Sequence, residues 1–192
     1  ASSSDGTKLA ATRYNGSVYT STDSGVTWNP QVSGNRLWYG IASSGDGTRL
    51  VAVPQGWYIH TSDNSGATWT PREEPGPVQW YSAASSADGM RIVAAVDIGS
   101  NLEVSVDGGA TWITRTPAGS AGYASVASSS DGLKLAAASI GSDDSIYLSS
   151  DGGVTWVKET GAGTRNWSSI VSSSDGTRLA ASVRGGYIYT RP

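Results

Sequence analysis

The sequence predicts an all-β protein assembled from tandem copies of one short unit. The string S-S-x-D-G occurs five times, beginning at Ser2, Ser43, Ser85, Ser128 and Ser172, so the spacing grows from 41 to 44 residues. Each copy contains four short runs at the spacing of antiparallel meanders. No run has the 3.6-residue apolar period of a helix. Four strands per copy, repeated in tandem, are typical of the blades of a β-propeller.

We therefore predict one domain over residues 1–192, a β-propeller of about five four-stranded antiparallel blades, with repeats starting near residues 1, 42, 84, 127 and 171. A blade cannot bury both of its faces alone, so we expect the blades to close into a ring. Residues 1–4 read as a stub of the first inner strand, and the last copy stops before its outer strand. The ring would be completed within a monomer or by another chain in an oligomer.

The elements of each copy follow one order. The S-S-x-D-G turn leads into a run with small apolar residues, at 7–12, 48–53, 90–95, 133–138 and 177–182. A glycine-bearing link and a second run follow, at 17–21, 57–62, 101–105, 145–149 and 186–190. A second turn then carries Thr-Trp into a third run. After a variable loop, a fourth run leads into the next copy, at 37–42, 79–84, 122–127 and 166–171.

Composition excludes several classes of protein. The chain is 38% hydrophobic and 15% charged, which suits a globular fold rather than a disordered one. Its net charge of -3 gives no cationic footprint for nucleic acid. No apolar stretch is long enough to span a membrane, and the absence of cysteine excludes disulfides. The chain opens at Ala1 rather than Met, which fits removal of a leader, so an extracellular or periplasmic location is favoured; trimming of the ends is the alternative.

The second turn of each copy reads S-x-D/N-x-G-x-T-W, at residues 21–28, 62–69, 105–112 and 149–156. This motif resembles the Asp-box, or bacterial neuraminidase, repeat. That family includes sialidase propellers, photosystem II assembly factors and lectin-like propellers, and with the repeat period the resemblance covers the whole chain. The resemblance implies blade architecture. It leaves function open, because hydrolases, lectins and scaffolds all carry this repeat.

A structural role is predicted for the acidic or amide position of the motif, which is Asp23, Asn64, Asp107 and Asp151. Its side-chain oxygen can accept turn N–H groups, and the threonine hydroxyl can bridge back to it. The tryptophans, Trp28, Trp69, Trp112 and Trp156, are expected to wedge between neighbouring blades with their N–H on a backbone carbonyl. Calcium binding is the alternative, and one carboxylate per turn falls short of the six to eight oxygens that Ca²⁺ prefers.

We do not expect an enzyme, a metal or a cofactor. Sialidase chemistry would need an arginine triad, a Tyr–Glu pair and an acidic Asp carried on long insertions, which the chain lacks. The arginines at 13, 36, 72, 165 and 184 are scattered among short loops, and no tyrosine–glutamate pairing recurs near Glu73, Glu74, Glu103 or Glu159. The single histidine, His60, is predicted to be a strand-surface residue at the position of Thr20 and Leu148, which excludes a catalytic triad or transition-metal site.

A ligand would bind on the face opposite these turns, where the loops vary. An aromatic residue opens the inner strand of four copies there: Trp38, Trp80, Tyr123 and Trp167. One interpretation is that these rings plug the channel or pack between blades. The other is a ring of stacking platforms for sugars, with polar neighbours, so that weak sites add up. The full candidate set adds Trp57, Arg36, Arg165, Asn35 and Asn166.

Three functional hypotheses follow. The first is a non-catalytic binding module with a glycan ligand. The second is a scaffold or assembly factor that docks a protein partner on the same face. The third is a designed or recently amplified propeller without a selected ligand, since blade-specific function normally erodes such similar copies. Nucleic acid and membranes are not expected as partners.

Overall fold

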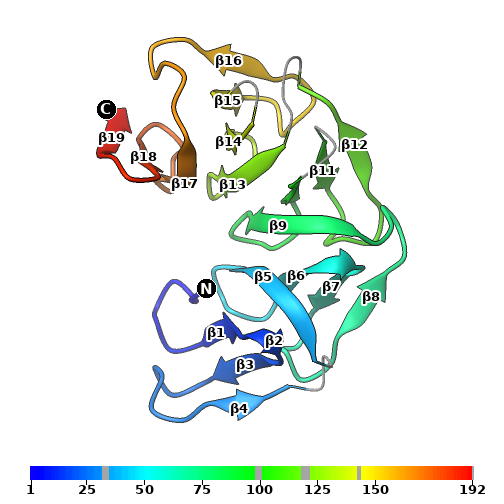
Figure 1. The fold of residues 1–192 in the computed structure, drawn as a ribbon. Coiled ribbons are helices and arrows are strands. Elements are labelled where there is room, and N and C mark those ends of the chain that lie inside the picture. The colour runs from blue at the N-terminus through cyan, green and yellow to red at the C-terminus, as the bar shows by residue number, and fades with distance from the viewer. Residues whose placement is uncertain (32–34, 98–100, 118–121, 142–143, 192) are drawn as a thin grey trace.

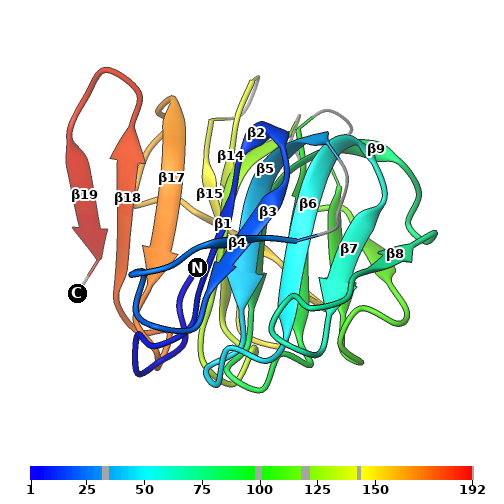
Figure 2. The same cartoon turned by 90° about the horizontal axis from the view of Figure 1, so that it is seen from below.

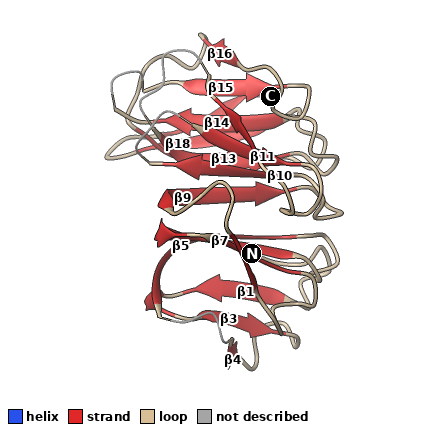
Figure 3. Ribbon diagram, turned by 90° about the vertical axis from the view of Figure 1, so that its right-hand side faces the viewer, coloured by secondary structure: helices blue, strands red, loops and turns tan. Residues whose placement is uncertain are grey.

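The computed structural model describes residues 1–31, 35–97, 101–117, 122–141 and 144–191, and within them the regular structure is entirely β-strand (Figure 3). The first strands are β1 (Leu9–Thr12), β2 (Tyr14–Gly16), β3 (Val18–Ser21), β4 (Asn29–Pro30), β5 (Arg36–Ser43), β6 (Leu50–Trp57), β7 (Ile59–Ser62), β8 (Thr70–Arg72) and β9 (Val78–Ser85). The others are β10 (Ile92–Val96), β11 (Leu102–Ser105), β12 (Ile113–Arg115), β13 (Tyr123–Ser128), β14 (Leu135–Ser139), β15 (Ile146–Ser149), β16 (Val157–Glu159), β17 (Trp167–Ser172), β18 (Leu179–Val183) and β19 (Ile188–Arg191). No described helix is long and apolar enough to cross a membrane.

The strands form consecutive antiparallel groups, which we number as sheets one to five. They are β1-β3-β4, β5-β6-β7-β8, β9-β10-β11-β12, β13-β14-β15-β16 and β17-β18-β19. At the far ends of the strands, β6 of sheet two also pairs with β9 of sheet three, and β2 pairs with β5 of sheet two. The hydrogen-bonded ladders there continue from one sheet to the next. The sheets stand side by side around an axis, with the first strand of each nearest to it (Figure 1). In sheet one that place is held only by a bridge between Ser2 and Leu9.

The expectation of a closed ring is not met by the described residues. Sheets one and five face each other across a gap, and the five sheets form an open arc (Figure 1). Closure depends on the angle between successive sheets, which side-chain packing sets and local sequence patterns do not report.

Both turn types lie at one end of the sheets, because the inner and third strands run in the same direction (Figure 2). We call residues 21–28, 62–69, 105–112 and 149–156 the box hairpins. In the first of them the Asp23 carboxylate accepts the Thr27 amide at 2.9 Å and the Thr27 hydroxyl at 2.6 Å. The Ser21 hydroxyl donates to the same carboxylate at 2.7 Å. These bonds, led by the Thr27 hydroxyl, lower the pKa of Asp23 to about 2, so the ionised form closes the turn.

The S-S-x-D-G turns use the same chemistry. The Ser3 hydroxyl donates to Asp5 at 2.6 Å and accepts the Lys8 amide at 3.0 Å. The bond from Ser3 is the largest of several that lower the pKa of Asp5 to about 2. The two turns of one sheet are also tied together, since the Ser24 amide donates to the Thr7 carbonyl at 3.0 Å.

Neighbouring sheets meet through a joint that recurs four times, which we call the inter-sheet joint. Its first part is a line of backbone hydrogen bonds across the S-S-x-D-G turns, from Ser4 to Gly45, Gly45 to Ala87, Ala87 to Ser130 and Ser130 to Ser174, at 2.7 to 2.8 Å. Its second part is a basic side chain whose stem covers the turn glycine of the next sheet: Lys8 on Gly47, Arg49 on Gly89, Arg91 on Gly132 and Lys134 on Gly176. Each of these glycines has a φ near +70°. A side chain there would be strained and would also meet the basic stem.

Apolar clusters fill the spaces between sheets. The aromatic residue that opens the inner strand of one sheet packs on the previous sheet, as Trp80 does in the cluster that holds Val51, Val53 and Ile59. A ring of this size buries about 200 Å², which at about 25 cal/mol per Å² corresponds to roughly 5 kcal/mol before entropy is counted. The box-hairpin rings Trp69, Trp112 and Trp156 pack at the margins of the same clusters.

Two expectations about single residues are wrong. His60 is buried rather than on a strand surface, and pairing with Ala52 places it at the position of Tyr19 and Tyr147, one residue from Thr20 and Leu148. The alternation of apolar residues did not reveal the position of His60, because a short strand can be aligned with the other copies in two registers. Trp28 is 41% exposed rather than wedged between sheets, since no described sheet precedes sheet one.

The box hairpins predict how substitution acts on stability. In sheet two, Asn64 accepts the Thr68 amide at 2.9 Å and its own amide donates to the Thr68 hydroxyl at 2.7 Å. Asp107→Ala removes the acceptor for Thr111 and Ser105, so we expect a fall in the thermal unfolding midpoint on the order of 3 °C. Asp107→Asn should cost less than half of that. Calorimetry of both variants checks the order, and equal losses would show that charge rather than turn geometry matters.

Candidate binding surface

β-Bulges place two tyrosines on the rim of the arc opposite the turns. The register of β5 on β6 shifts between Trp38 and Gly40, and that of β9 on β10 shifts between Trp80 and Ser82. The extra residues are Tyr39 and Tyr81. A bulge leaves one residue unpaired and turns its side chain away from the ladder. Sheets four and five have the same shift, but its residues there are Ala124 and Ser168.

These tyrosines belong to a row of three rings. The centroids of Tyr39 and Tyr81 are 5.0 Å apart, and those of Tyr39 and Tyr14 are 5.8 Å apart in an edge-to-face arrangement. Gly40 lets sheets two and three approach each other closely at this point. A Cβ atom at residue 40 would lie 2.9 Å from the Val53 side chain and 3.2 Å from the backbone of Ser82. The row thus runs from β2 across sheet two to sheet three.

Arg36, three residues before Tyr39 on β5, is the centre of a second group of side chains. Its guanidinium lies 5.1 Å from the ring centroid of Trp57 and 5.8 Å from that of Trp38. Partial burial lowers its pKa, and its Nε is buried without a hydrogen-bond partner among the described residues. We call Tyr14, Tyr39, Tyr81, Arg36 and Trp57 the aromatic patch.

Three of its rings are accessible to a ligand. Tyr14 is 61% exposed, Trp57 52% and Tyr39 37%. The pKa of Tyr39 is raised, first by burial of its hydroxyl and then by Tyr14 and Tyr81. The phenol therefore stays protonated over the physiological range and can donate a hydrogen bond. The patch offers flat apolar faces, hydroxyl groups and one cation.

The sequence-predicted residues divide into three sets. Arg36 and Trp57 join the aromatic patch, and Asn35 is exposed at its edge. Trp38, Trp80, Tyr123 and Trp167 are buried between sheets, and this placement favours packing over stacking on a ligand. Arg165 and Asn166 are exposed on sheet five, where the Arg165 guanidinium lies 4.4 Å from the Tyr189 ring centroid.

Sequence reasoning did not single out Tyr39 or Tyr81 as candidate site residues. The signal was the repeated Trp-Tyr pair at 38–39 and 80–81, in which one aromatic is buried and the next is not. Strict alternation would have sent the tyrosine into the opposite inter-sheet space. Only the bulge, which is not visible in the residue pattern, places it on the rim.

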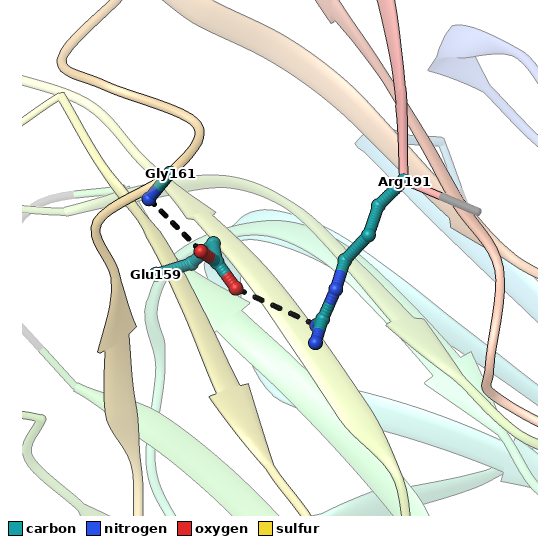
Figure 4. A network of polar contacts seen from close by, with 3 residues as sticks. All are labelled: Glu159, Gly161 and Arg191. Atoms are coloured by element: carbon teal, nitrogen blue, oxygen red, sulfur yellow. Dashed lines mark hydrogen bonds and ion pairs between the residues drawn. The ribbon is translucent and has the colours of Figure 1, made fainter.

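A cavity of about 270 Å³ lies between sheets four and five. It is lined by Arg165 together with Ile146, Trp167 and Tyr189. Glu159 and Arg191 close one side of it with an ion pair at 3.5 Å, and Glu159 also accepts the Gly161 amide at 2.9 Å (Figure 4). Its ionisable side chains contact one another, because Glu159 pairs with Arg191 and the Arg165 guanidinium lies over the Tyr189 ring.

Other titratable groups are held in structural contacts. Burial raises the pKa of Glu103, whose carboxylate accepts the Thr114 hydroxyl at 2.9 Å. Among the described residues, no three His, Cys, Asp or Glu side chains gather closely enough to hold a metal ion.

No known family model matches the sequence, and a search of curated proteins finds no match. Solved structures do match. A GH74 enzyme of Niastella koreensis aligns at 20% identity and a TM-score of 0.73, covering 96% of this chain and 34% of that one. YCF48 with a bound D1 peptide aligns at 16% and 0.71, covering 100% and 63%. The β-propeller domain of Cps50 (Swd1) from Myceliophteria thermophila aligns at 13% and 0.75, covering 99% and 63%.

The fold is a β-propeller. This chain spans less than two thirds of the length of each of these propellers, and identities of this size carry fold information only. The sheets around the axis, the inner-strand order and the turn-bearing end of this propeller are those described above.

His60 predicts a pH effect beside the patch. Its ring lies 5.3 Å from that of Trp38, and burial first, then the charge of Arg36, lower its pKa below 6.5. The unfolded chain therefore binds a proton that the folded chain excludes, so stability falls as pH drops below about 6.5. His60→Tyr, which restores the residue found at 19 and 147, should flatten that dependence. Urea unfolding at pH 7 and pH 5 measures it, and an unchanged slope would assign the effect to other groups.

Proposed function

We propose that this propeller is a non-catalytic binding module that docks a protein segment on the aromatic patch. The observation that carries the proposal is the cluster of partly exposed Tyr, Trp and Arg side chains on one rim. These residue types are enriched at protein interfaces and in their hot spots. The Tyr and Trp rings bury a large area and lose little side-chain entropy, and the hydroxyl and guanidinium groups provide hydrogen bonds for orientation.

The surroundings of the patch suit an extended peptide. The three tyrosine rings form a row rather than a closed pocket, and Arg36, which lies over Trp57, supplies a cation on the same strand as Tyr39. Backbone carbonyls or an acidic side chain of a partner could pair with that cation, while apolar side chains cover the tyrosine faces. Another propeller of this fold, YCF48, has been solved with a bound peptide, which supports peptide docking as a use of this architecture.

Several observations support a non-catalytic role, although GH74 enzymes share the fold. The carboxylates of the turns are engaged in hydrogen bonds that lower their pKa values, so they are poor general acids. Glu103 has a raised pKa, but its side chain is buried and accepts the hydroxyl of Thr114 on the adjacent strand β12. This proposal therefore keeps the expectation that the chain is not an enzyme.

We also propose the finer architecture: about five Asp-box-type blades of a four-stranded plan in one domain. The hydroxyl–carboxylate bonds of the box hairpins support the Asp-box assignment. The four-stranded sheets two, three and four support the blade plan, with sheet one lacking an inner strand and sheet five an outer one. Of the two interpretations given for Trp38, Trp80, Tyr123 and Trp167, this proposal adopts packing between sheets, because all four are buried.

Panning a random peptide library against the full chain tests the function. We expect enriched peptides whose affinity falls at least about tenfold in Tyr39→Ala and in Trp57→Ala, because each substitution removes an exposed ring from the patch. Tyr187→Ala is the matched control, since Tyr187 is 80% exposed on the same rim but lies on sheet five.

A glycan array run in parallel separates the competing hypothesis. Glycan signals that are lost in Tyr39→Ala, with no enriched peptide, would replace the protein partner by a sugar ligand. Peptides that bind Tyr39→Ala and Trp57→Ala as tightly as the unchanged chain would remove the aromatic patch from the mechanism.

A further inference from the structure

The polar groups of the aromatic patch are N–H and O–H groups. Tyr14, Tyr39 and Tyr81 carry phenol hydroxyls, while Arg36 carries a guanidinium and Trp57 an indole N–H. None of these side chains contains a carbonyl or a carboxylate. Burial of the Tyr39 hydroxyl, followed by its contacts with Tyr14 and Tyr81, raises the pKa of Tyr39 and keeps that phenol protonated. A complementary partner therefore presents unpaired hydrogen-bond acceptors.

The contacts among the tyrosine rings decide where a ligand can lie. The centroids of Tyr39 and Tyr81 are 5.0 Å apart, and those of Tyr14 and Tyr39 are 5.8 Å apart. These are the separations of aromatic pairs in direct contact, so no ligand group fits between the rings. The row therefore does not enclose a cation in the way that an aromatic cage does. A partner must lie across the exposed faces and edges of the rings.

Trp57 provides a second apolar contact position beside the row. Its ring is 52% exposed, and the Arg36 guanidinium lies 5.1 Å from its centroid. Arg36 precedes Tyr39 by three residues on β5, a length of about 10 Å in an extended strand. A ligand that uses both positions needs apolar groups that recur at about this distance.

A polyproline II helix has both the matching repeat and the matching chemistry. Its rise of about 3.1 Å per residue places residues i and i+3 about 9 Å apart on one face. The helix has no internal hydrogen bonds, so its carbonyl groups are unpaired, and proline carries no N–H. Such a ligand needs donors from its partner and few acceptors, and the aromatic patch supplies donors.

The other common modes of peptide recognition fit the patch less well. In the nine-stranded sheet, β5 stands between β6 and β2, and β9 stands between β10 and β6. Addition of a strand requires a free row of backbone groups, so the pairing here favours recognition by side chains. A helical partner pairs its backbone carbonyls within itself, and it would leave the donors of the patch without backbone acceptors.

We propose that the aromatic patch binds a proline-rich segment of a partner protein in the polyproline II conformation. A proline at position i covers the row of Tyr14, Tyr39 and Tyr81, and a proline at position i+3 covers Trp57. The phenols and the Arg36 guanidinium donate to carbonyls of the segment. The cost of ordering the segment is small, because the proline ring already fixes φ. This inference rests on the proposed function, which it narrows to one backbone conformation of the partner.

Decaproline is the probe, and isothermal titration of the full chain measures its affinity. We expect binding that is weakened at least about tenfold in Tyr39→Ala and in Trp57→Ala, because each substitution removes one of the two apolar positions. Tyr187→Ala, which removes an 80% exposed ring on sheet five, should leave the affinity unchanged.

Two controls separate backbone conformation and hydrogen bonding from simple apolar contact. Decaproline with two central D-proline residues has the same composition, but the opposite sign of φ at those residues interrupts the left-handed helix. It should bind at least about fivefold more weakly, because only one apolar position remains within reach of each half. Tyr14→Phe keeps the ring and should weaken decaproline by about threefold to tenfold through loss of a hydroxyl donor.

The outcomes distinguish this inference from the proposed function. The inference is overturned if decaproline does not bind, if the D-proline peptide binds as tightly, or if Tyr39→Ala leaves the affinity unchanged. Library peptides that lack proline but depend on Tyr39 and Trp57 would retain the proposed function and remove the polyproline II segment. Failure of decaproline together with the absence of any patch-dependent peptide would remove both.

Discussion

The bond between a serine hydroxyl and an aspartate carboxylate two residues later is the constraint on which this architecture depends. It occurs at 2.5 to 2.6 Å in every S-S-x-D-G turn and at 2.7 to 2.8 Å in the box hairpins that carry aspartate. The serine oxygen also accepts a backbone amide, so one short side chain closes the turn from both directions. Because the turn is rigid, its central backbone groups face the neighbouring sheet. The line of inter-sheet hydrogen bonds is a consequence of these closed turns.

The turns and strand order could be predicted from the sequence because their causes are local. The carboxylate of Asp23, the hydroxyl of Thr27 and the glycine between them are within eight residues, and the same chemistry holds when Asn64 replaces the aspartate. The packing of Trp112 and Trp156 on a neighbouring sheet also followed from ring size alone. Each of these features needs only a few adjacent residues and would form in almost any propeller built from this repeat.

Features set by packing between sheets could not be predicted in this way. His60 was misplaced by one residue because an alternation of four residues fits two registers, and only the pairing with Ala52 decides between them. Tyr39 was overlooked because a bulge interrupts the alternation, and the bulge arises where β5 and β9 approach at Gly40. The candidate site depends on that interruption: a regular β5 would bury Tyr39 between sheets, and the row with Tyr14 and Tyr81 would not form.

The aromatic patch and the open ends reflect two different responses of one repeat to its surroundings. Where a sheet has neighbours on both sides, the residues that the copies share pack between the sheets. The candidate surface arises where the copies differ, as at Tyr39 and Tyr81 against Ala124 and Ser168. Where a neighbour is missing, unchanged residues become exposed, as Trp28 does although Trp112 in the same role is packed. The first kind of exposure follows from a difference in sequence, whereas the exposure of Trp28 follows from the absence of a preceding sheet among the described residues.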